Sequence, residues 1–209
     1  MTETRTMEQV SFSRMEHGTR EDYLLLQRLE KPHLAGTAER LLRELARQDE
    51  ETFEGYKITR LGHALQTATL AERDGADDDW IVAALLHDIG DGLAPQNHDR
   101  FAAEILRPFV REEVAWAVEH HGAFQMVYYA HHYGWNPDER DKYRDSPFFQ
   151  SCADFCARWD QAAFDPDCPT ETLAHFAPRV RAVFGRKAYD PAVVRAGVVL
   201  GVPAARVAG

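Results

Sequence analysis

The sequence predicts an all-α fold, and three observations lead to that expectation. Apolar residues recur at the three- and four-residue spacing of amphipathic helices over most of the chain. Helix start and stop signals bound several of these segments, among them an acidic start at Asp77–Asp79 and stops at Gly75 and Gly90. No stretch of the sequence shows convincing strand alternation, an internal repeat or low complexity.

The first half of the chain divides into a polar start, two helical stretches and a central block. Residues 1–20 are expected to be flexible, and one domain is expected to span 21–209. Residues 20–50 are rich in strong helix formers, and residues 52–62 form a connector. In the central block, helices are expected at 63–73 and at 77–88. The second of these is apolar on nearly every face, so it belongs in the interior of the domain.

Further helices are expected in the second half. Residues 98–109 and 111–122 form two helices separated near Pro108. An aromatic segment, 123–135, precedes a charged turn at 136–145. A long helix over 146–164 has a Ser-Pro start, and closing helices follow at 170–184 and 190–200.

Composition excludes several classes of protein. The formal net charge of -10 argues against binding to nucleic acid or to an anionic membrane. No apolar run approaches the roughly 20 residues that a membrane span needs. The N-terminal residues lack the apolar centre of a signal peptide, so a cytoplasmic location is expected. Cys152 and Cys156 lie four residues apart, as in a zinc or redox pair, but burial as small apolar residues is favoured.

The strongest chemical signal is the dipeptide His87-Asp88 at the end of the apolar helix. A buried aspartate is costly unless it is paired or bound to a cation. Taken alone, the pair has a structural alternative, in which Asp88 caps the next turn beside a core histidine. His63 lies one helix earlier and 24 residues before His87, on a helix that is apolar on two faces, so it can reach the pair.

Helix faces select the remaining candidates. His98 opens the following helix, and His121 continues an apolar stripe that His120 misses. Asp160 shares a side with Cys152 and Cys156, whereas Asp154 lies on a polar side where it can pair with Arg158. The predicted metal ligands are therefore four imidazoles and two carboxylates: His63, His87, Asp88, His98, His121 and Asp160.

This ligand mixture suits iron, manganese or zinc better than calcium or magnesium. Six ligands exceed what one catalytic ion needs if it must keep open positions. With Asp88 as a bridge, they suit two ions in one pocket.

The order His, His-Asp, His, His, Asp on successive helices resembles the HD-domain superfamily. Within it, the chain resembles the diiron oxygenase branch, which contains myo-inositol oxygenase and bacterial phosphonate-cleaving oxygenases. The motifs LGHALQTA, AALLHDIGD, NHDRFAAEILRPF, VEHHGAFQ and FCARWDQAAFDPD carry the resemblance, which extends from about Tyr56 to Phe184. It implies a single HD domain, a helical bundle around a dinuclear site, with a metal-binding core over about 56–184.

The same resemblance implies an Fe(II)/Fe(III) pair bridged by Asp88, although other divalent transition metals would fit the ligands. A small hydroxylated substrate would bind one iron and O2 the other. Abstraction of a substrate hydrogen would then lead to oxidative C–C or C–P cleavage. The sequence leaves the substrate and the oligomeric state open.

Several positions depart from the relatives with known substrates. Asp91 stands where myo-inositol oxygenase has a lysine, and Gln125 stands where the phosphonate enzymes have one. Ala157 replaces their arginine, and Phe53 and Tyr56 are nearest to their lid positions. No clamp for an anion is visible, and Asp91 either orients a substrate hydroxyl, meets a cationic group or braces the HDIGDG turn.

The aromatic segment after His121 is a candidate pocket wall or ordinary helix packing. Asp91, Gln125, Tyr129 and His132 are the predicted substrate-binding residues, Asp88 and Asp91 are the predicted catalytic residues, and Trp159 is expected in the core.

A diiron oxygenase is favoured over a metal-dependent phosphohydrolase, because the HDIGDG turn offers acids rather than donors for a phosphate. A scaffold without activity ranks last, since all six ligands are present.

Overall fold

The computed structural model describes residues 8–50 and 55–194, and within these ranges its regular elements are helices only. The predicted all-α class is therefore confirmed. None of the helices in the described ranges is both long and apolar enough to cross a membrane. The nine α-helices of these ranges are α1 (Arg20–Ala35), α2 (Thr37–Arg47), α3 (Arg60–Arg73), α4 (Asp78–Leu86), α5 (His98–Leu106), α6 (Glu112–Tyr129), α7 (Phe149–Phe155), α8 (Leu173–Phe184) and α9 (Pro191–Val194).

Shorter helical turns complete the described fold. Three are 3-10 turns: η1 (Met15–His17), η2 (Ala130–Tyr133) and η3 (Glu139–Tyr143). The fourth, η4 (Cys156–Asp160), continues α7 as a π-helical turn.

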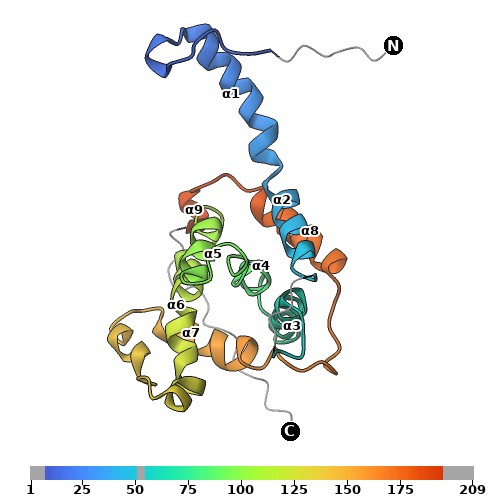
Figure 1. The fold of residues 1–209 in the computed structure, drawn as a ribbon, viewed down its shortest axis with the longest axis vertical. Helices are drawn as coiled ribbons and strands as arrows, with labels where there is room; N and C mark the ends of the chain where they lie inside the picture. Colours follow the sequence, from blue (N-terminus) through green and yellow to red (C-terminus); the bar gives the residue numbers. More distant parts are fainter. Residues whose placement is uncertain (1–7, 51–54, 195–209) are drawn as a thin grey trace.

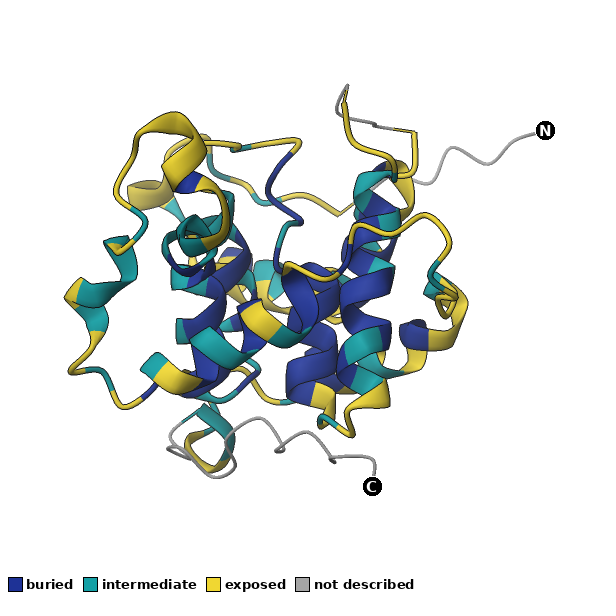
Figure 2. Cartoon of the chain, turned by 90° about the horizontal axis from the view of Figure 1, so that it is seen from below, coloured by how far each residue is buried: buried dark blue, intermediate teal, exposed yellow. Residues whose placement is uncertain are grey.

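Helix α4 forms the centre of the body, and α3, α6 and α8 pack against it (Figure 1). Its residues from Asp79 to Leu86 are all buried, as the apolar pattern predicted. Asp77 caps its first turn by accepting from the backbone N–H of Trp80 at 3.2 Å. The buried segments gather in the interior of the bundle, and the exposed ones lie at its margins (Figure 2). This arrangement places His87 and Asp88, the two residues that follow α4, in the interior of the helical bundle.

Helix α1 extends away from the body (Figure 1), and Asp22 is its only buried residue. Asp22 and Thr19 form a reciprocal capping box, and Asp22 Oδ1 also accepts from the Ser11 N–H at 2.7 Å. These contacts hold part of the stretch that the sequence assigns to a flexible N-terminus. The domain boundary at residue 20 stays a prediction, and residues 1–7 lie outside the described part.

Helix α6 is longer than the sequence indicates. A glycine commonly ends a helix, but α6 runs through Gly122 and continues to Tyr129. Helix α6 packs against α5 along its length, and a Cβ at Gly122 would meet only the end of the Asp99 side chain at 3.4 Å, an ordinary contact distance. The tertiary contacts of α6 therefore continue past Gly122, and the aromatic segment begins as helix.

The expected long helix over 146–164 is also interrupted. It begins at Phe149 and changes to the π-helical turn η4, in which the Gln161 N–H donates to the Cys156 carbonyl at 3.0 Å. A π turn holds one more residue than an α turn and frequently occurs at functional sites. The final expected helix is described as α9 up to Val194, and residues 195–200 of it lie outside the described part.

Candidate metal centre

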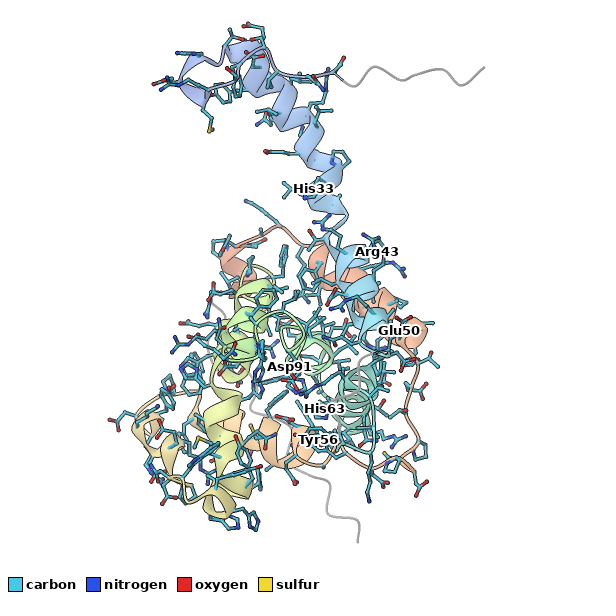
Figure 3. All side chains as sticks on the ribbon, in the orientation of Figure 1. His33, Arg43, Glu50, Tyr56, His63 and Asp91 are labelled. Atoms are coloured by element: carbon cyan, nitrogen blue, oxygen red, sulfur yellow. The ribbon has the colours of Figure 1, made fainter. Side chains whose placement is uncertain are left out.

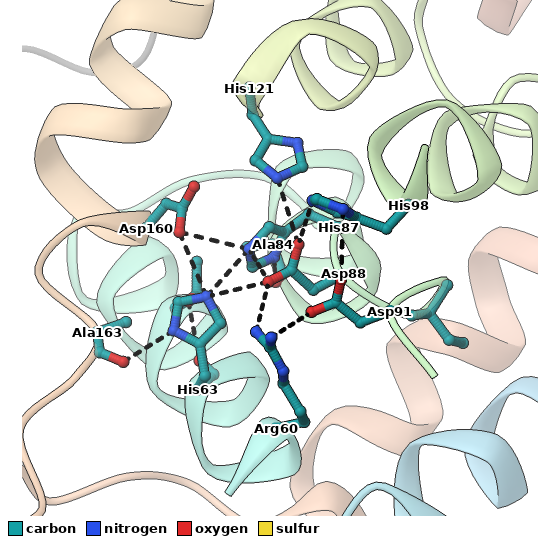
Figure 4. A network of polar contacts seen from close by, with 12 residues as sticks. Arg60, His63, Ala84, His87, Asp88, Asp91, His98, His121, Asp160 and Ala163 are labelled. Atoms are coloured by element: carbon teal, nitrogen blue, oxygen red, sulfur yellow. Dashed lines mark hydrogen bonds and ion pairs between the residues drawn. The ribbon is translucent and has the colours of Figure 1, made fainter. Parts of the chain in front are cut away.

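The six predicted ligands converge around Asp88 from five parts of the chain (Figure 4). Thr59 caps α3 and so places His63 one turn into that helix. His87 is the residue after α4, and His98 is the first residue of α5. His121 comes from the middle of α6, and Asp160 ends η4.

The Asp88 carboxylate lies between two pairs of imidazoles. Its Oδ2 is 3.6 Å from His63 Nε2 and 3.5 Å from His87 Nε2. Its Oδ1 is 3.3 Å from both His98 Nε2 and His121 Nε2. One carboxylate thus faces two separate groups of nitrogen donors, one with each oxygen.

Asp160 completes the half of the centre that contains His63 and His87. Its Oδ1 is 3.3 Å from His63 Nε2 and 3.4 Å from His87 Nε2. Two triads could each hold a metal ion, because their ligand atoms lie within 4.8 Å of one another: His63, His87 and Asp160, and His87, Asp88 and His121.

Backbone carbonyls orient all four imidazoles. A carbonyl only accepts, so each Nδ1 must be the protonated donor, and the neutral ring then directs the Nε2 lone pair at the centre. The Nε2 atoms of His63 and His87 are 3.1 Å apart, and two lone pairs at this distance repel unless a cation lies between them. The four contacts are His63 to Ala163 at 2.9 Å, His87 to Ala84 at 2.8 Å, His98 to Pro95 at 3.1 Å and His121 to Val118 at 2.7 Å.

Two buried carboxylate oxygens at the centre have no hydrogen-bond donor, Asp88 Oδ1 and Asp160 Oδ2. An acceptor left without a donor in the interior costs free energy. Nitrogen and oxygen donors in this mixture are those that iron, manganese and zinc bind. The residues therefore fit the predicted pair of transition-metal ions.

The electrostatics of the protein without metal point the same way. Burial opposes an imidazolium at His87 and His121, but the carboxylates of Asp88 and Asp160 outweigh it, so both histidine pKa values rise, that of His121 to about 10. Burial also opposes ionised carboxylates, but the neighbouring histidines lower the pKa values of Asp88 and Asp160. The centre therefore favours positive charge, which protons supply until a metal displaces them.

Comparison with known proteins agrees with this geometry. Residues 60–147 match the HD domain family. The matched span is less than half of the chain. The matched span contains the first five predicted ligands, and Asp160 lies beyond its end.

Two curated relatives belong to the oxygenase branch of this superfamily, which confirms the resemblance seen in the sequence. The chain is 34% identical over 88 residues to [1-hydroxy-2-(trimethylamino)ethyl]phosphonate dioxygenase (glycine-betaine-forming) of Leisingera caerulea, covering 37% of this chain and 45% of the relative. It is 35% identical over 83 residues to hydroxymethylphosphonate dioxygenase of Gimesia maris, covering 34% and 41%. The matches thus span less than half the length of either relative.

Arg60, the first residue of the span that matches the family, contacts the centre and is not among the residues that the sequence predicts. Its Nη2 lies 2.7 Å from Asp91 Oδ2, and its Nη1 lies 3.7 Å from Asp88 Oδ2. The expectation that only acids surround the HDIGDG turn is therefore wrong. The spacing from Arg60 to His63 places both on one helix face and is a signal that could have revealed it.

Asp91 is engaged by the protein at both of its oxygens. Oδ2 pairs with Arg60, and Oδ1 lies 3.3 Å from Nδ1 of His98. Burial and the nearby carboxylate of Asp88 raise the Asp91 pKa. Asp91 thus links a predicted ligand to the arginine, an arrangement close to the bracing role that the sequence left open.

A cavity of about 870 Å³ opens onto the centre. Gln125 and Tyr129, two of the predicted substrate-binding residues, line it, but His132 is exposed and lies against His131. Tyr133, at the end of the 3-10 turn η2, lines the cavity instead. Tyr128 and Trp135 add to this aromatic wall.

A stack of rings covers the His63 side of the centre. Phe164 stacks on His63 with ring centroids 4.5 Å apart, and Tyr56 stacks on Phe164 at 5.7 Å. The Arg60 guanidinium lies 5.6 Å from the centroid of the Tyr56 ring. Tyr56, His63 and Asp91 all lie within the body, whereas His33 on α1 lies outside it (Figure 3). Phe53, the other predicted lid position, is outside the described residues.

The alternatives to the chosen ligands have other partners. The His120 ring stacks on the Trp116 ring with centroids 4.2 Å apart, and His120 Nδ1 lies 2.8 Å from the backbone carbonyl oxygen of Trp116. Asp154 accepts from Gln150 Nε2 at 2.7 Å on the exposed side of its helix.

Neighbours on the same helix have structural roles. Arg158 pairs with Asp74 at 2.7 Å across the fold, and the expected local pair with Asp154 stays a prediction. Trp159 is buried, as expected, and its indole N–H donates to Asp74. Cys152 and Cys156 are buried and free.

Proposed function

We propose that this HD-domain protein is an oxygenase that uses two iron ions and O2 to oxidise or cleave a small hydroxylated substrate. The observation that carries the proposal is the position of Asp88, with one oxygen facing His63 and His87 and the other facing His98 and His121. The two relatives support the reaction class, since both are named as dioxygenases of hydroxylated phosphonates.

The residues divide naturally into two sets of ligands. His63, His87 and Asp160 would hold one ion, and His98 and His121 the other, with Asp88 shared by both. Bound iron would supply the one-electron redox chemistry and the open positions that O2 and substrate need.

The rest of the cavity would position the substrate and exclude water. Gln125 and Tyr129 offer polar groups beside the centre. Phe164 and Tyr56 shield the His63 side, so solvent has less access to the reacting atoms. Asp91 would fix the orientation of His98 and Arg60, which makes it a positioning residue in this proposal.

A metal-dependent phosphohydrolase is the second candidate, and one observation favours it. Arg60 and Lys57 both line the cavity, and cationic side chains are the donors that a phosphate ester requires. The same charges are equally suited to a phosphonate, so an experiment must decide between the two reactions.

The deciding measurement is low-temperature EPR of protein loaded with iron under anaerobic conditions and then partially oxidised. The oxygenase proposal predicts two irons per chain and the signal of a mixed-valent pair with one unpaired electron. His121→Ala should abolish this signal, whereas His120→Ala should retain it, because the His120 ring lies on Trp116 and not at the centre.

Two irons per chain without this signal would contradict the oxygenase. Phosphate release from a phosphomonoester with Mn(II), lost in His87→Ala, would establish the hydrolase instead.

A further inference from the structure

Positive charge reaches the cavity from one side. Among the described residues that line it, the lysine and arginine side chains are Lys57 and Arg60, just before and at the start of α3. The opposite wall, on α6, presents the neutral Gln125 and the phenols of Tyr128 and Tyr129. Asp88, Asp91 and Asp160 also line the cavity, so an anionic ligand would bind on the α3 side once the proposed metal ions balance the charge of Asp88 and Asp160.

Arg60 is held at the cavity wall. Asp91 pairs with its Nη2 at 2.7 Å, and its guanidinium carbon, Cζ, lies 5.6 Å from the centroid of the Tyr56 ring. Its side chain is 19% exposed, and the exposed part faces the cavity that it lines. Because these contacts fix the orientation of the guanidinium in advance, a ligand would lose little entropy on binding to it.

Arg60 also lies beside the carboxylate that divides the metal centre. Its Nη1 is 3.7 Å from Asp88 Oδ2, so a group held by the guanidinium would be adjacent to both sets of ligands. Guanidinium N–H groups match the paired oxygens of phosphonates and carboxylates. A hydroxyl on the neighbouring carbon of such an acid could then reach the centre while the acid group stays on Arg60.

We propose that Arg60, positioned by Asp91, is the residue that binds the oxyanion group of the substrate. This assignment deepens the proposed function and rests on it in taking the cavity as the substrate site. A phosphonate and a carboxylate share the recognising chemistry, and the experiment distinguishes them.

The test is anaerobic isothermal titration calorimetry of iron-loaded protein, in which ligands bind without turnover. Three probes share a hydroxymethyl group: hydroxymethylphosphonate, glycolate and the neutral ethylene glycol. We expect one of the anions to bind at least about tenfold more tightly than the diol. Whichever anion binds more tightly identifies the acid group that the cavity takes.

Arg60→Gln removes the charge and keeps a group that can donate to Asp91. It should weaken binding of the preferred anion by at least about tenfold and leave the diol unchanged. Arg181→Gln is the matched control, because Arg181 pairs with Glu39 at the surface and does not line the cavity. It should change neither affinity.

Equal anion affinity in wild type and Arg60→Gln, at equal iron content, would overturn the proposal. If Arg60→Gln loses iron, Arg60→Lys decides, since it keeps the charge and loses the paired donors: it should weaken anion binding about threefold or more, and unchanged affinity would overturn the proposal.

The two proposals can fail separately. Binding of an anion that depends on Arg60, in a protein that gives no mixed-valent signal, would remove the oxygenase and retain the anion site. A mixed-valent signal with binding independent of Arg60 would do the reverse.

Discussion

Two aspartates at opposite ends of α4, the buried Asp79 in its first turn and the part-buried Asp88 just after its end, have opposite surroundings. Near its start, Asp79 Oδ2 accepts from the backbone N–H and Nη1 of Arg111 at 3.1 and 3.2 Å, and its Oδ1 accepts from Arg186 at 2.6 Å. After its end, Asp88 faces four imidazole Nε2 atoms, and its Oδ1 has no hydrogen-bond donor.

The difference shows that burial alone does not mark a carboxylate as functional. Arginine stays protonated in proteins, so it satisfies Asp79 permanently. The imidazoles around Asp88 have Nδ1 tied to carbonyls and can leave a lone pair on Nε2, so only a proton or a metal satisfies the group. We infer that Asp79 stabilises the fold through its arginine pairs and that Asp88 is a cation ligand.

The largest expected effect is that of Asp88→Asn, which removes the shared charge. Changes to residues that merely support metal ligands cost about 10–100-fold, so loss of a bridging ligand should lower metal affinity and activity by more than about a hundredfold. Metal analysis of the purified variant should find at most one ion per chain. Retention of two ions would contradict the role of Asp88 as a bridge.

The second effect is the dependence of metal affinity on pH. The carboxylates of Asp88 and Asp160 raise the pKa values of His87 and His121 against the effect of burial, that of His121 to about 10, so in the metal-free protein the His121 ring is an imidazolium near pH 7. Their stabilising pairs with the carboxylates are complete below the unfolded pKa of about 6.5 and are lost as pH rises through the folded values.

A metal must displace these protons, so its affinity should rise about tenfold per pH unit for each proton released. Chelator competition at pH 6, 7 and 8 measures the slope, and calorimetry in buffers of different ionisation enthalpy counts the protons. A flat profile would show that the rings are already neutral.

The third effect tests the other end of α4. Asp79→Asn removes the carboxylate that Arg186 pairs with and one of the carboxylates beside Arg111, which keeps Asp77 at 2.8 Å, and it should lower the free energy of unfolding by about 3 kcal/mol. Metal content per folded chain should not change. Asp78→Asn is the control, since its side chain is half exposed and paired with Arg179, and it should cost less than about 1 kcal/mol. Urea unfolding with metal analysis measures both quantities.

The smallest effect concerns a third buried carboxylate, Glu113, which accepts from Ser151 at one oxygen and has no hydrogen-bond donor at the other. Burial raises its pKa. The folded state therefore favours the neutral acid, and stability falls as pH rises from the unfolded value of about 4.3 through the raised folded value. Glu113→Gln should raise Tm by about 2–4 °C at pH 7.

The gain should disappear below the unfolded pKa, where both forms are neutral. Thermal melts at pH 7 and pH 4 decide the point. An equal gain at both pH values would show that charge is not its cause.

Much of the fold and the candidate centre could be predicted, because both follow from helix periodicity. The apolar helix that became α4 was recognisable from its composition, and the position of His87-Asp88 followed from its end. Helix faces also separated His121 from His120 and Asp160 from Asp154, and the structure brings the selected residue of each pair to Asp88 or its neighbours.

What could not be predicted depends on tertiary packing. The sequence places Arg60 in a connector. In the fold it is the first residue of α3 and pairs with Asp91, which lies in the turn after α4. The sequence ends a helix at Gly122, whereas α6 continues to Tyr129 as it packs against α5. The chain then turns into η2, and it is Tyr133 in this turn, not His132, that lines the cavity.

The π-helical turn at Cys156–Asp160 makes the position of a ligand depend on the type of helix that carries it. One residue more than an α turn needs is accommodated there, and the turn ends at Asp160. If the same residues formed a regular α-helix, the carboxylate of Asp160 would be rotated by about 100° around the helix axis, which is the rotation of one α-helical residue. The sixth ligand is thus set by local backbone geometry as well as by residue type, so a substitution that converts this turn to α-helix would open one side of the centre while every ligand remained in the sequence.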